Sequence, residues 1–393
     1  MANRRAIIAR RRRNLILAAL MAFVVGILVG ARSGGGSEER PGGVRTAADP
    51  PVGAPDPREP APVDRLSLRQ QVGQLIVLRF AGTSPPGYVR AVLRERRAAG
   101  VILFRDNVTA PEQLRALTGR LRRAGGRPIV AVDQEGGAIR ILPWAPPAAS
   151  APAQAAAGTV RADARAAATA LRRLGVTVSL APVGDVPSVA DAALGGRAFS
   201  DEPAQAGEAM AAAVAGWRAG GVAATAKHFP GLGGATVNTD DGPATIERSR
   251  AALEATDLPP FVAAIEAGVP LVMIGHARYP ALDGARIASQ SPAILGDLLR
   301  DRLGFRGVVV TDSMEAQASL ATGAITTVSE RAVRAGADLL LLTGQGSYAP
   351  VYEHLLALAR RSPGFRARVR ESAARVLGLK QGDVVASGDN PVP

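Results

Sequence analysis

The chain contains no cysteine, only two lysines and three histidines, and few aromatic residues. Without cysteine it can form no disulfide, no thiolate nucleophile and no cysteine-ligated metal site. Aromatic residues make up 4% of the sequence, so the stacking platforms that hold single-stranded nucleic acid are scarce. Arginine supplies nearly all the cationic side chains, and a solvated cation in this chain would usually be arginine. The lysine at position 227 is therefore informative.

Length and charge narrow the class of protein further. With 393 residues, 47% of them hydrophobic, the chain can bury the core of one large domain or two smaller ones. The net charge is +13, and six of the arginines that contribute to it lie before residue 14, namely Arg4, Arg5 and the run 10–13. No basic segment interleaved with aromatic residues follows, so we predict no nucleic-acid partner.

The amino terminus has the pattern of a membrane anchor. A basic segment, residues 1–14, precedes an uncharged apolar run over residues 15–31. A spanning helix needs about 20 apolar residues, with a lower limit near 17. The arginines place residues 1–14 in the cytoplasm, so the rest of the chain is expected outside it. The "VGA" before Arg32 leaves open a cleaved signal peptide and a secreted protein.

Composition changes sharply after the apolar run. Residues 32–64 are rich in Gly, Pro and Ala and cannot bury enough apolar surface to order themselves, so they are interpreted as a disordered linker. The body is expected over residues 65–380, followed by a flexible tail, 381–393. Within the body, short apolar runs alternate with amphipathic helical patterns, many of which end in glycine.

The apolar runs predict an α/β fold with a buried parallel sheet, because such strands are covered on both faces. Eight strand–helix units in about 300 residues favour a single (β/α)8 TIM-like barrel over an open sheet. No dinucleotide fingerprint or P-loop follows any strand. The eight runs are "QLIVLRF", "AGVILF", "PIVAVDQ", "VTVSLAPV", "AATAKHF", "PLVMIGH", "GVVVTDS" and "DLLLLTG".

Polar residues gather where these strands end. In a barrel the carboxyl ends of the strands form the face on which active sites are built. A single polar residue after a strand is common in turns. Removing a ring of charged groups from water costs free energy, so such a ring indicates a functional site. The ring comprises Asp106, Asn107, Asp133, Glu135, Asp185, Lys227, His228, His276 and Asp312.

Three motifs in this order resemble the N-terminal catalytic domain of glycoside hydrolase family 3, and most of all its single-domain bacterial β-N-acetylglucosaminidases. They are "AVDQEGG", "KHFPG" and "LGFRGVVVTDSM". The resemblance runs from about Leu66 to Gly378. It implies a barrel that hydrolyses β-glycosides with retention and uses no metal or organic cofactor. Cell-wall or related amino-sugar fragments with terminal N-acetylglucosamine-type residues would be the carbohydrate substrate.

The resemblance also implies roles for individual residues. Asp312, in the "TDSM" segment, corresponds to the nucleophile of the family. Asp133, after the third strand, corresponds to its sugar-binding acid, and Arg197 in "GGRAFSDEP" to its loop arginine. The Lys227–His228 pair corresponds to the lysine and histidine that hold the sugar. These residue types suit a retaining mechanism, which needs a carboxylate nucleophile and a proton donor about 5 Å apart.

The sequence departs from the family pattern at the proton donor. Where the family has an Asp-x-His pair in a mobile loop, this chain has Asn238 and Asp240, and Ile141 stands where an arginine helps to hold the sugar. We hypothesise that Asp240 is the acid/base, oriented by Asn238, with a pKa raised by Asp241 and by loop closure. The alternative is that "NTDDG" is only a polar turn.

Three functions remain open from the sequence. The first is a retaining exo-β-glycosidase, specifically a β-N-acetylhexosaminidase active in peptidoglycan turnover. The second is a sugar-binding barrel that has lost its acid/base and does not catalyse. The third is a hydrolase of altered specificity, such as a β-glucosidase, which the loss of an arginine at Ile141 would permit.

Overall fold

The computed structural model describes residues 61–382. The predicted membrane segment, 15–31, and all of the predicted linker up to residue 60 lie outside these residues. Within residues 61–382, no helix is both long and apolar enough to cross a membrane. Val63, which the sequence placed in the linker, lies in the short 3-10 helix Pro62–Arg65 and is buried.

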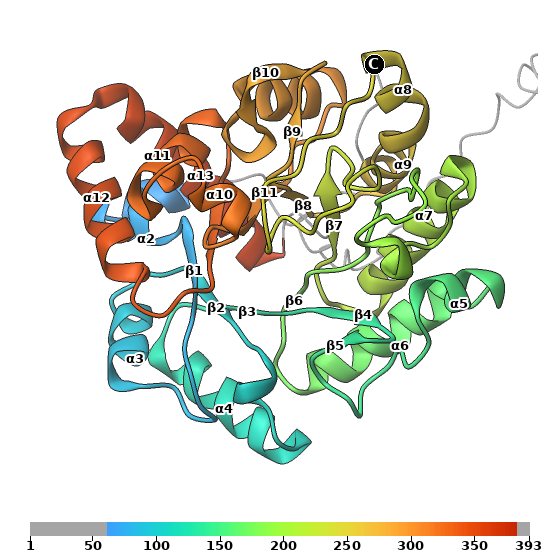
Figure 1. Cartoon of the computed structure of the whole chain (residues 1–393). Helices are drawn as coiled ribbons and strands as arrows, with labels where there is room; N and C mark the ends of the chain where they lie inside the picture. The colour runs from blue at the N-terminus through green and yellow to red at the C-terminus, as the bar shows by residue number, and fades with distance from the viewer. Residues whose placement is uncertain (1–60, 383–393) are drawn as a thin grey trace, which may run out of the picture. The chain divides into compact units, whose positions relative to one another are not determined.

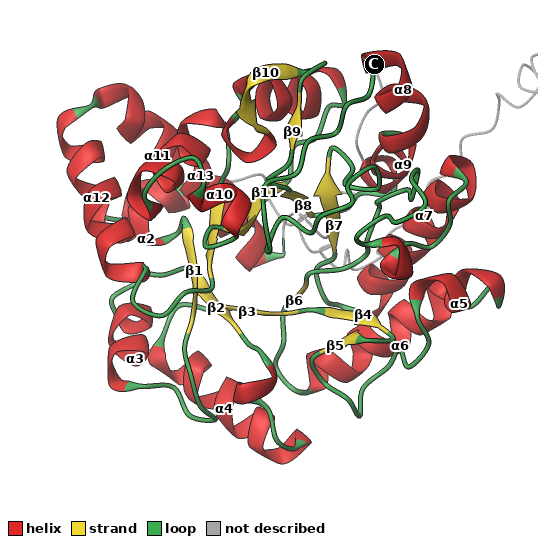
Figure 2. Ribbon diagram, viewed as in Figure 1, coloured by secondary structure: helices red, strands yellow, loops and turns green. Residues whose placement is uncertain are grey.

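Eight parallel strands form one sheet in which each strand lies beside its neighbours in chain order (Figures 1 and 2). Hydrogen bonds join the strands in the order β6, β3, β2, β1, β12, β11, β8 and β7. The two end strands, β6 and β7, meet through bridges between Val178 and Ala223 and between Val183 and Lys227, which close the sheet into a barrel. The predicted α/β architecture of eight parallel strands is thus confirmed. The strands are β1 (Ile76–Arg79), β2 (Gly100–Ile102), β3 (Ile129–Val132), β6 (Val178–Ser179), β7 (Thr225–Phe229), β8 (Leu271–Ile274), β11 (Val308–Ser313) and β12 (Leu339–Leu342).

Helices follow the strands and surround the barrel. Proline at the first position starts α4 and α7, where its missing N–H costs no hydrogen bond. Arginines in the last turns of α3, α4, α6 and α7 complement the negative helix ends. The helices next to the strands are α3 (Gly87–Arg94), α4 (Pro111–Ala124), α6 (Val160–Arg173), α7 (Pro203–Gly220), α9 (Pro259–Glu266), the π-helix η6 (Ala293–Arg302), α11 (Ile325–Ala335) and α12 (Tyr348–Arg361).

Shorter elements fill the connections. A hairpin of β4 and β5 follows β3, and a second hairpin, β9 with β10, follows β8. The last helix, α13 (Pro363–Gln381), ends beneath the barrel. The others are α2 (Leu68–Gly73), η2 (Arg105–Asn107), β4 (Gln134–Gly136), β5 (Ile139–Arg140), α5 (Ala151–Ala156), η3 (Gly195–Arg197), α8 (Arg250–Ala252), η4 (Leu253–Asp257), β9 (Arg278–Tyr279), β10 (Asp283–Ile287), η5 (Ala288–Gln290) and α10 (Gln317–Leu320).

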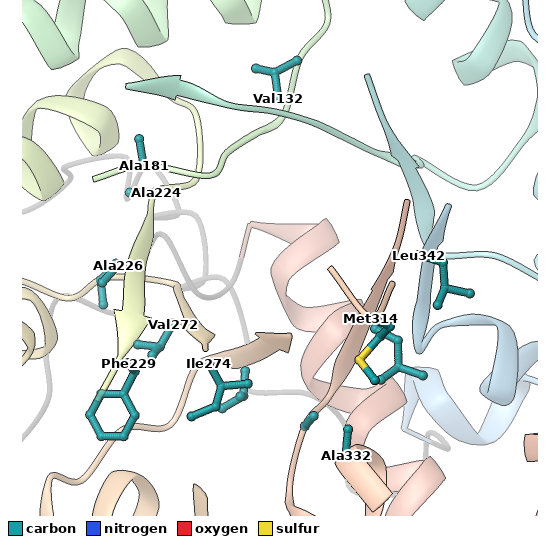
Figure 3. Close-up of a cluster of buried hydrophobic side chains, with 14 of the residues drawn as sticks. Val132, Ala181, Ala224, Ala226, Phe229, Val272, Ile274, Met314, Ala332 and Leu342 are labelled. Atoms are coloured by element: carbon teal, nitrogen blue, oxygen red, sulfur yellow. The ribbon is translucent and has the colours of Figure 1, made fainter. Parts of the chain in front are cut away.

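Alternate residues of each strand face opposite sides of the sheet, as the period of a strand requires. One set, including Val132, Ile274 and Leu342, packs outward against the helices (Figure 3). The other set fills the barrel interior, and Val376 and Leu379 of α13 pack against it from below. Residues that continue the inward-facing alternation beyond the carboxyl ends of the strands place their side chains in the mouth of the barrel. This explains why polar residues that follow the strands lie there.

Candidate active site

A cavity of about 390 Å³ opens at the carboxyl ends of the strands. The inward alternation accounts for several of its residues: Asp133 is two positions beyond Ala131, and Asp312 is two beyond Val310. All six residues that the sequence predicted for the site line this one cavity. They are Asp133, Arg197, Lys227, His228, Asp240 and Asp312.

Lys227 lies at the centre of a network of charges on the cavity wall. Its ammonium group is 2.6 Å from Asp133 Oδ1 and 2.7 Å from Glu135 Oε1, and its side chain is only 2% exposed. Arg197 binds the same glutamate with two hydrogen bonds, of 2.8 and 2.7 Å. Burial acts to raise the pKa of Glu135, but the charges of Lys227 and Arg197 outweigh it and hold the pKa at about 2. Glu135 therefore stays ionised at neutral pH.

His228 is fixed from behind by Asp185. The imidazole Nδ1 is 2.7 Å from Asp185 Oδ2, and the other carboxylate oxygen accepts the backbone N–H groups of His228 and Leu232. Although Asp185 is fully buried, the histidine and these two N–H groups lower its pKa. A carboxylate at Nδ1 makes that nitrogen the donor, so Nε2 points into the cavity, 3.9 Å from Asp312 Oδ2.

Asp312 lies near the end of β11 with its side chain 18% exposed. Its Oδ1 accepts the Ser313 N–H at 2.8 Å. Burial would raise the pKa of Asp312, but His228 and His276 lower it to a value below normal. His276 is itself held between the Ser289 hydroxyl and the Ser313 carbonyl, each at 2.8 Å. Asp312 is thus an ionised carboxylate beside two imidazoles.

The loop after β7 covers one side of the cavity. Its backbone runs against Val186, and a Cβ on Gly233 would lie 1.8 Å from the Val186 carbonyl oxygen, so only glycine fits there. Asp240 projects from this loop into the cavity mouth. Asp240 is exposed at this mouth, like Asp241, and partial desolvation, the charge of Asp312 and, least of all, the charge of Asp241 together raise its pKa. Asn238 accepts the backbone N–H of Asp240 at 3.1 Å, so it fixes the loop backbone rather than the carboxyl group.

Ile141, where the sequence departs from the family pattern, also lies at this cavity. Ile141 lines the cavity together with Ile139, and Leu232 is buried in its wall. Asp241 is exposed and does not line the cavity. Within residues 61–382 no cluster of three or more carboxylate and histidine side chains is arranged to hold a metal ion.

Four residues at the site were not assigned a role from the sequence. Glu135, Asp185 and His276 were noted as strand-end polar residues, but their partners lie on other elements, namely η3, β7 and β11. Arg79, two positions beyond the inward Val77, also lines the cavity, with its guanidinium 4.7 Å above the Phe104 ring. The inward alternation of β1 is the signal that could have identified it.

Comparison with known proteins gives a consistent picture. Residues 67–379 match the model of the glycosyl hydrolase family 3 N-terminal domain. A protein named beta-hexosaminidase from Xanthomonas oryzae pv. oryzae is 36% identical over 280 residues, which cover 68% of this chain and 83% of that protein. A similarly named protein from Stenotrophomonas maltophilia is also 36% identical over 280 residues, 68% of this chain and 83% of that protein.

Solved structures agree with these matches. The beta-N-acetylhexosaminidase of Beutenbergia cavernae superposes with a TM-score of 0.75 at 32% identity, covering 80% of this chain and 99% of that one. The family 3 beta-N-acetylglucosaminidase of a Paenibacillus species gives the same TM-score at 30% identity. That match covers 84% of this chain, which spans only 65% of the Paenibacillus protein.

Proposed function

The chain belongs to glycosyl hydrolase family 3, and we propose that it is a retaining exo-β-glycosidase, specifically a β-N-acetylhexosaminidase. Asp312 is the nucleophile in this proposal and Asp240 the acid/base. Asp133, Arg197, Lys227 and His228 hold the sugar. The names of the relatives from Xanthomonas and Beutenbergia support the substrate class.

The opposite pKa shifts of two carboxylates in one cavity carry the proposal. The pKa of Asp312 is lowered and that of Asp240 is raised, partly by the charge of Asp312 itself. Carboxyl groups whose environments separate their pKa values are suited to divide into nucleophile and acid. A retaining glycosidase needs this pair, because one group must attack while ionised and the other must donate a proton.

The reaction then proceeds in two displacements. Asp312 forms a bond to the anomeric carbon while the glycosidic C–O bond breaks, and Asp240 transfers its proton to the departing oxygen. In the second step Asp240, now ionised, takes a proton from water, and the water oxygen displaces Asp312 from the sugar. Both displacements pass through an oxocarbenium-like transition state, so configuration at the anomeric carbon is retained.

The cavity wall suits an amino sugar. Lys227 and Asp133 present donors and acceptors to sugar hydroxyls, while Ile139 and Ile141 supply an apolar surface. An acetamido methyl group gains free energy from contact with such a surface, whereas a hydroxyl group would lose hydrogen bonds to water there. This favours N-acetylglucosamine-type residues of cell-wall fragments over β-glucosides.

We also propose where the enzyme works. Residues 15–31 anchor it in the membrane, the 32–64 linker tethers it, and the barrel lies outside the cytoplasm, or the protein is secreted if the anchor is cleaved. Fractionation tests this location. Recovery of the full chain from the soluble cytoplasmic fraction would rule it out.

The acid/base assignment is tested by leaving-group dependence. In Asp240→Ala, kcat/KM for N,N′-diacetylchitobiose should fall by roughly 100-fold or more, the usual contribution of a general acid. The 2,4-dinitrophenyl glycoside needs no protonation and should lose much less. Added azide, a nucleophile that needs no general base, should replace water in the second step, displace Asp312 and give a β-glycosyl azide. Asp241→Ala, which alters the neighbouring exposed carboxylate, is the control and should keep activity on both substrates.

Each other outcome selects an alternative. Equal, modest losses on both substrates would mean that "NTDDG" is only a polar turn. Absence of hydrolysis by the wild-type protein would favour a non-catalytic sugar-binding barrel. Faster turnover of the p-nitrophenyl β-glucoside than of the N-acetylglucosaminide would favour a β-glucosidase.

A further inference from the structure

The amino-terminal end of the barrel, opposite the proposed active site, holds two adjacent cavities lined by cations. Their volumes are about 260 and 280 Å³, and Arg127, Pro128 and Lys380 line both of them. Arg96 completes the first and Arg122 the second. The arginines come from the connections that lead into β2 and β3 and from the end of α4, and Lys380 from the last turn of α13.

Lys380 differs from Lys227, the other lysine of the chain, in the groups that neutralise its charge. Lys227 contacts two carboxylates, whereas the ammonium group of Lys380 has one neutral partner, Gln74 Oε1, at 2.8 Å. Burial, with a smaller effect from Arg96, lowers the pKa of Lys380 to about 7. Among residues 61–382, no acidic side chain lines either cavity. A largely buried cation among arginines is stabilised when an anion joins it.

The backbone at these cavities is unusual as well. Arg96, with φ of 57°, and Arg127, with φ of 48°, have left-handed conformations, and no other non-glycine residue described by the structure has a positive φ. This region is disfavoured for a side chain as large as arginine. Both exceptions line the same cavity as Lys380, and both are exposed side chains. Strained backbone conformations cluster at functional sites, so two of them at one cavity indicate a binding site.

The surface around the cavities is also basic. The last turns of α3, α4 and α6 point toward this end of the barrel, because each leads into the start of the next strand. They carry Arg94, Arg123 and the pair 172–173, all exposed. Residues 87–178 contain fifteen arginines and six acidic residues, of which Arg105, Arg140, Asp106, Asp133 and Glu135 belong to the other end. A positive field therefore surrounds the entrance.

We propose that these two cavities form a phosphate-binding site, separate from the proposed active site. Phosphate oxygens would accept hydrogen bonds from Lys380, Arg96 and Arg127, since guanidinium groups match the geometry of oxyanions. The phosphate is either free in solution or part of an anionic phospholipid headgroup. The site does not depend on glycosidase activity.

The test is the effect of each ligand on thermal unfolding of the full chain in detergent. Inorganic phosphate is compared with chloride at matched ionic strength. Monomeric dihexanoyl phosphatidylglycerol is compared with dihexanoyl phosphatidylcholine. A site of this kind should raise Tm by roughly 2–5 °C at ten to a hundred times Kd. Lys380→Met and Arg127→Gln should remove that increment, whatever their own Tm. Arg165→Gln, an exposed change on α6 outside the cavities, should keep it.

Each result decides the proposal. An increment with inorganic phosphate that needs Lys380 supports a site for free phosphate, and one confined to phosphatidylglycerol supports a site for a headgroup. If neither ligand raises Tm, or if the rise is equal in Lys380→Met and the wild type, the site does not exist. Hydrolysis of glycosides is measured separately, so failure of either proposal leaves the other standing.

Discussion

Replacing Glu135 by glutamine should destabilise the protein strongly, even though the change removes a single charge. Glu135 is 5% exposed and contacts both Lys227, at 2.7 Å, and Arg197, through two hydrogen bonds. The substitution leaves two cations facing one remaining carboxylate, Asp133. Breaking a buried ion pair from one side costs about 3–5 kcal/mol, because the partner charge stays buried without compensation.

The pKa of Glu135 gives a second estimate of the loss in unfolding free energy. Its value of about 2, against 4.5 for the free group, is a shift of about 2.5 units, or about 3 kcal/mol at 1.36 kcal/mol per unit. Because the folded-state pKa is the lower one, this stabilisation is present above pH 4.5. It is lost as the pH falls toward 2. The two routes agree on a loss of about 3 kcal/mol at pH 7.

Urea unfolding at pH 7 and at pH 3 measures this loss. The free energy of unfolding of Glu135→Gln should be about 3 kcal/mol below that of the wild type at pH 7, and the gap should narrow at pH 3. Glu208→Gln, a charge removed from an exposed position on α7, should change the free energy by less than about 0.5 kcal/mol. A gap below about 1 kcal/mol at pH 7, or one that does not narrow in acid, would refute the reasoning.

Two further predictions concern Gly233 and Asp257, which support the loop after β7. Gly233→Ala places a Cβ 1.8 Å from the Val186 carbonyl oxygen and should lower Tm by roughly 5 °C or more and reduce activity, whereas Gly296→Ala, which meets no atom within 4 Å, should not lower Tm. Burial raises the pKa of Asp257 to about 7 despite its ion pair with Arg248 at 3.0 Å. An acid with a raised folded-state pKa makes stability fall as the pH rises from about 4 to 7. Asp257→Asn should remove that fall in a Tm profile from pH 4.5 to 8, and an unchanged profile would contradict the raised pKa.

Much of the fold could be predicted because parallel strands covered on both faces have continuous apolar sequences. Even the two-residue strand β6 follows from the run "VTVSLAPV". The widening of the helical segment 293–302 into a π-helix could not be predicted, because its apolar spacing is that of an ordinary helix. Hydrogen-bond register within a helix depends on packing against its neighbours, which no local pattern specifies.

The site could be predicted as a set of residues but not as a network. Asp133 and Lys227 are 94 residues apart, and only closure of the barrel makes them partners. The motif "DQEGG" offers two acids, and the sequence does not tell which one Arg197 binds. The structure answers through the β4–β5 hairpin, which turns the chain back on itself and leaves Glu135 beside Arg197. Such pairings depend on distances across the barrel, and the spacing of residues along the chain does not determine these distances.

The proposed exchange of histidine for aspartate raises a problem of reach, because an aspartate side chain is shorter. The loop backbone offers a solution. The carbonyl oxygens of Thr239 and Asp240 accept hydrogen bonds from the N–H groups of Ala318 and Gln317, at 3.1 and 3.2 Å. Those donors begin α10, five residues after Asp312 on the same chain segment. These two hydrogen bonds therefore hold the loop directly against the segment that carries the proposed nucleophile. The charge of Asp312 contributes to the raised pKa of Asp240, so the two carboxyl groups interact across the cavity although the aspartate side chain is short.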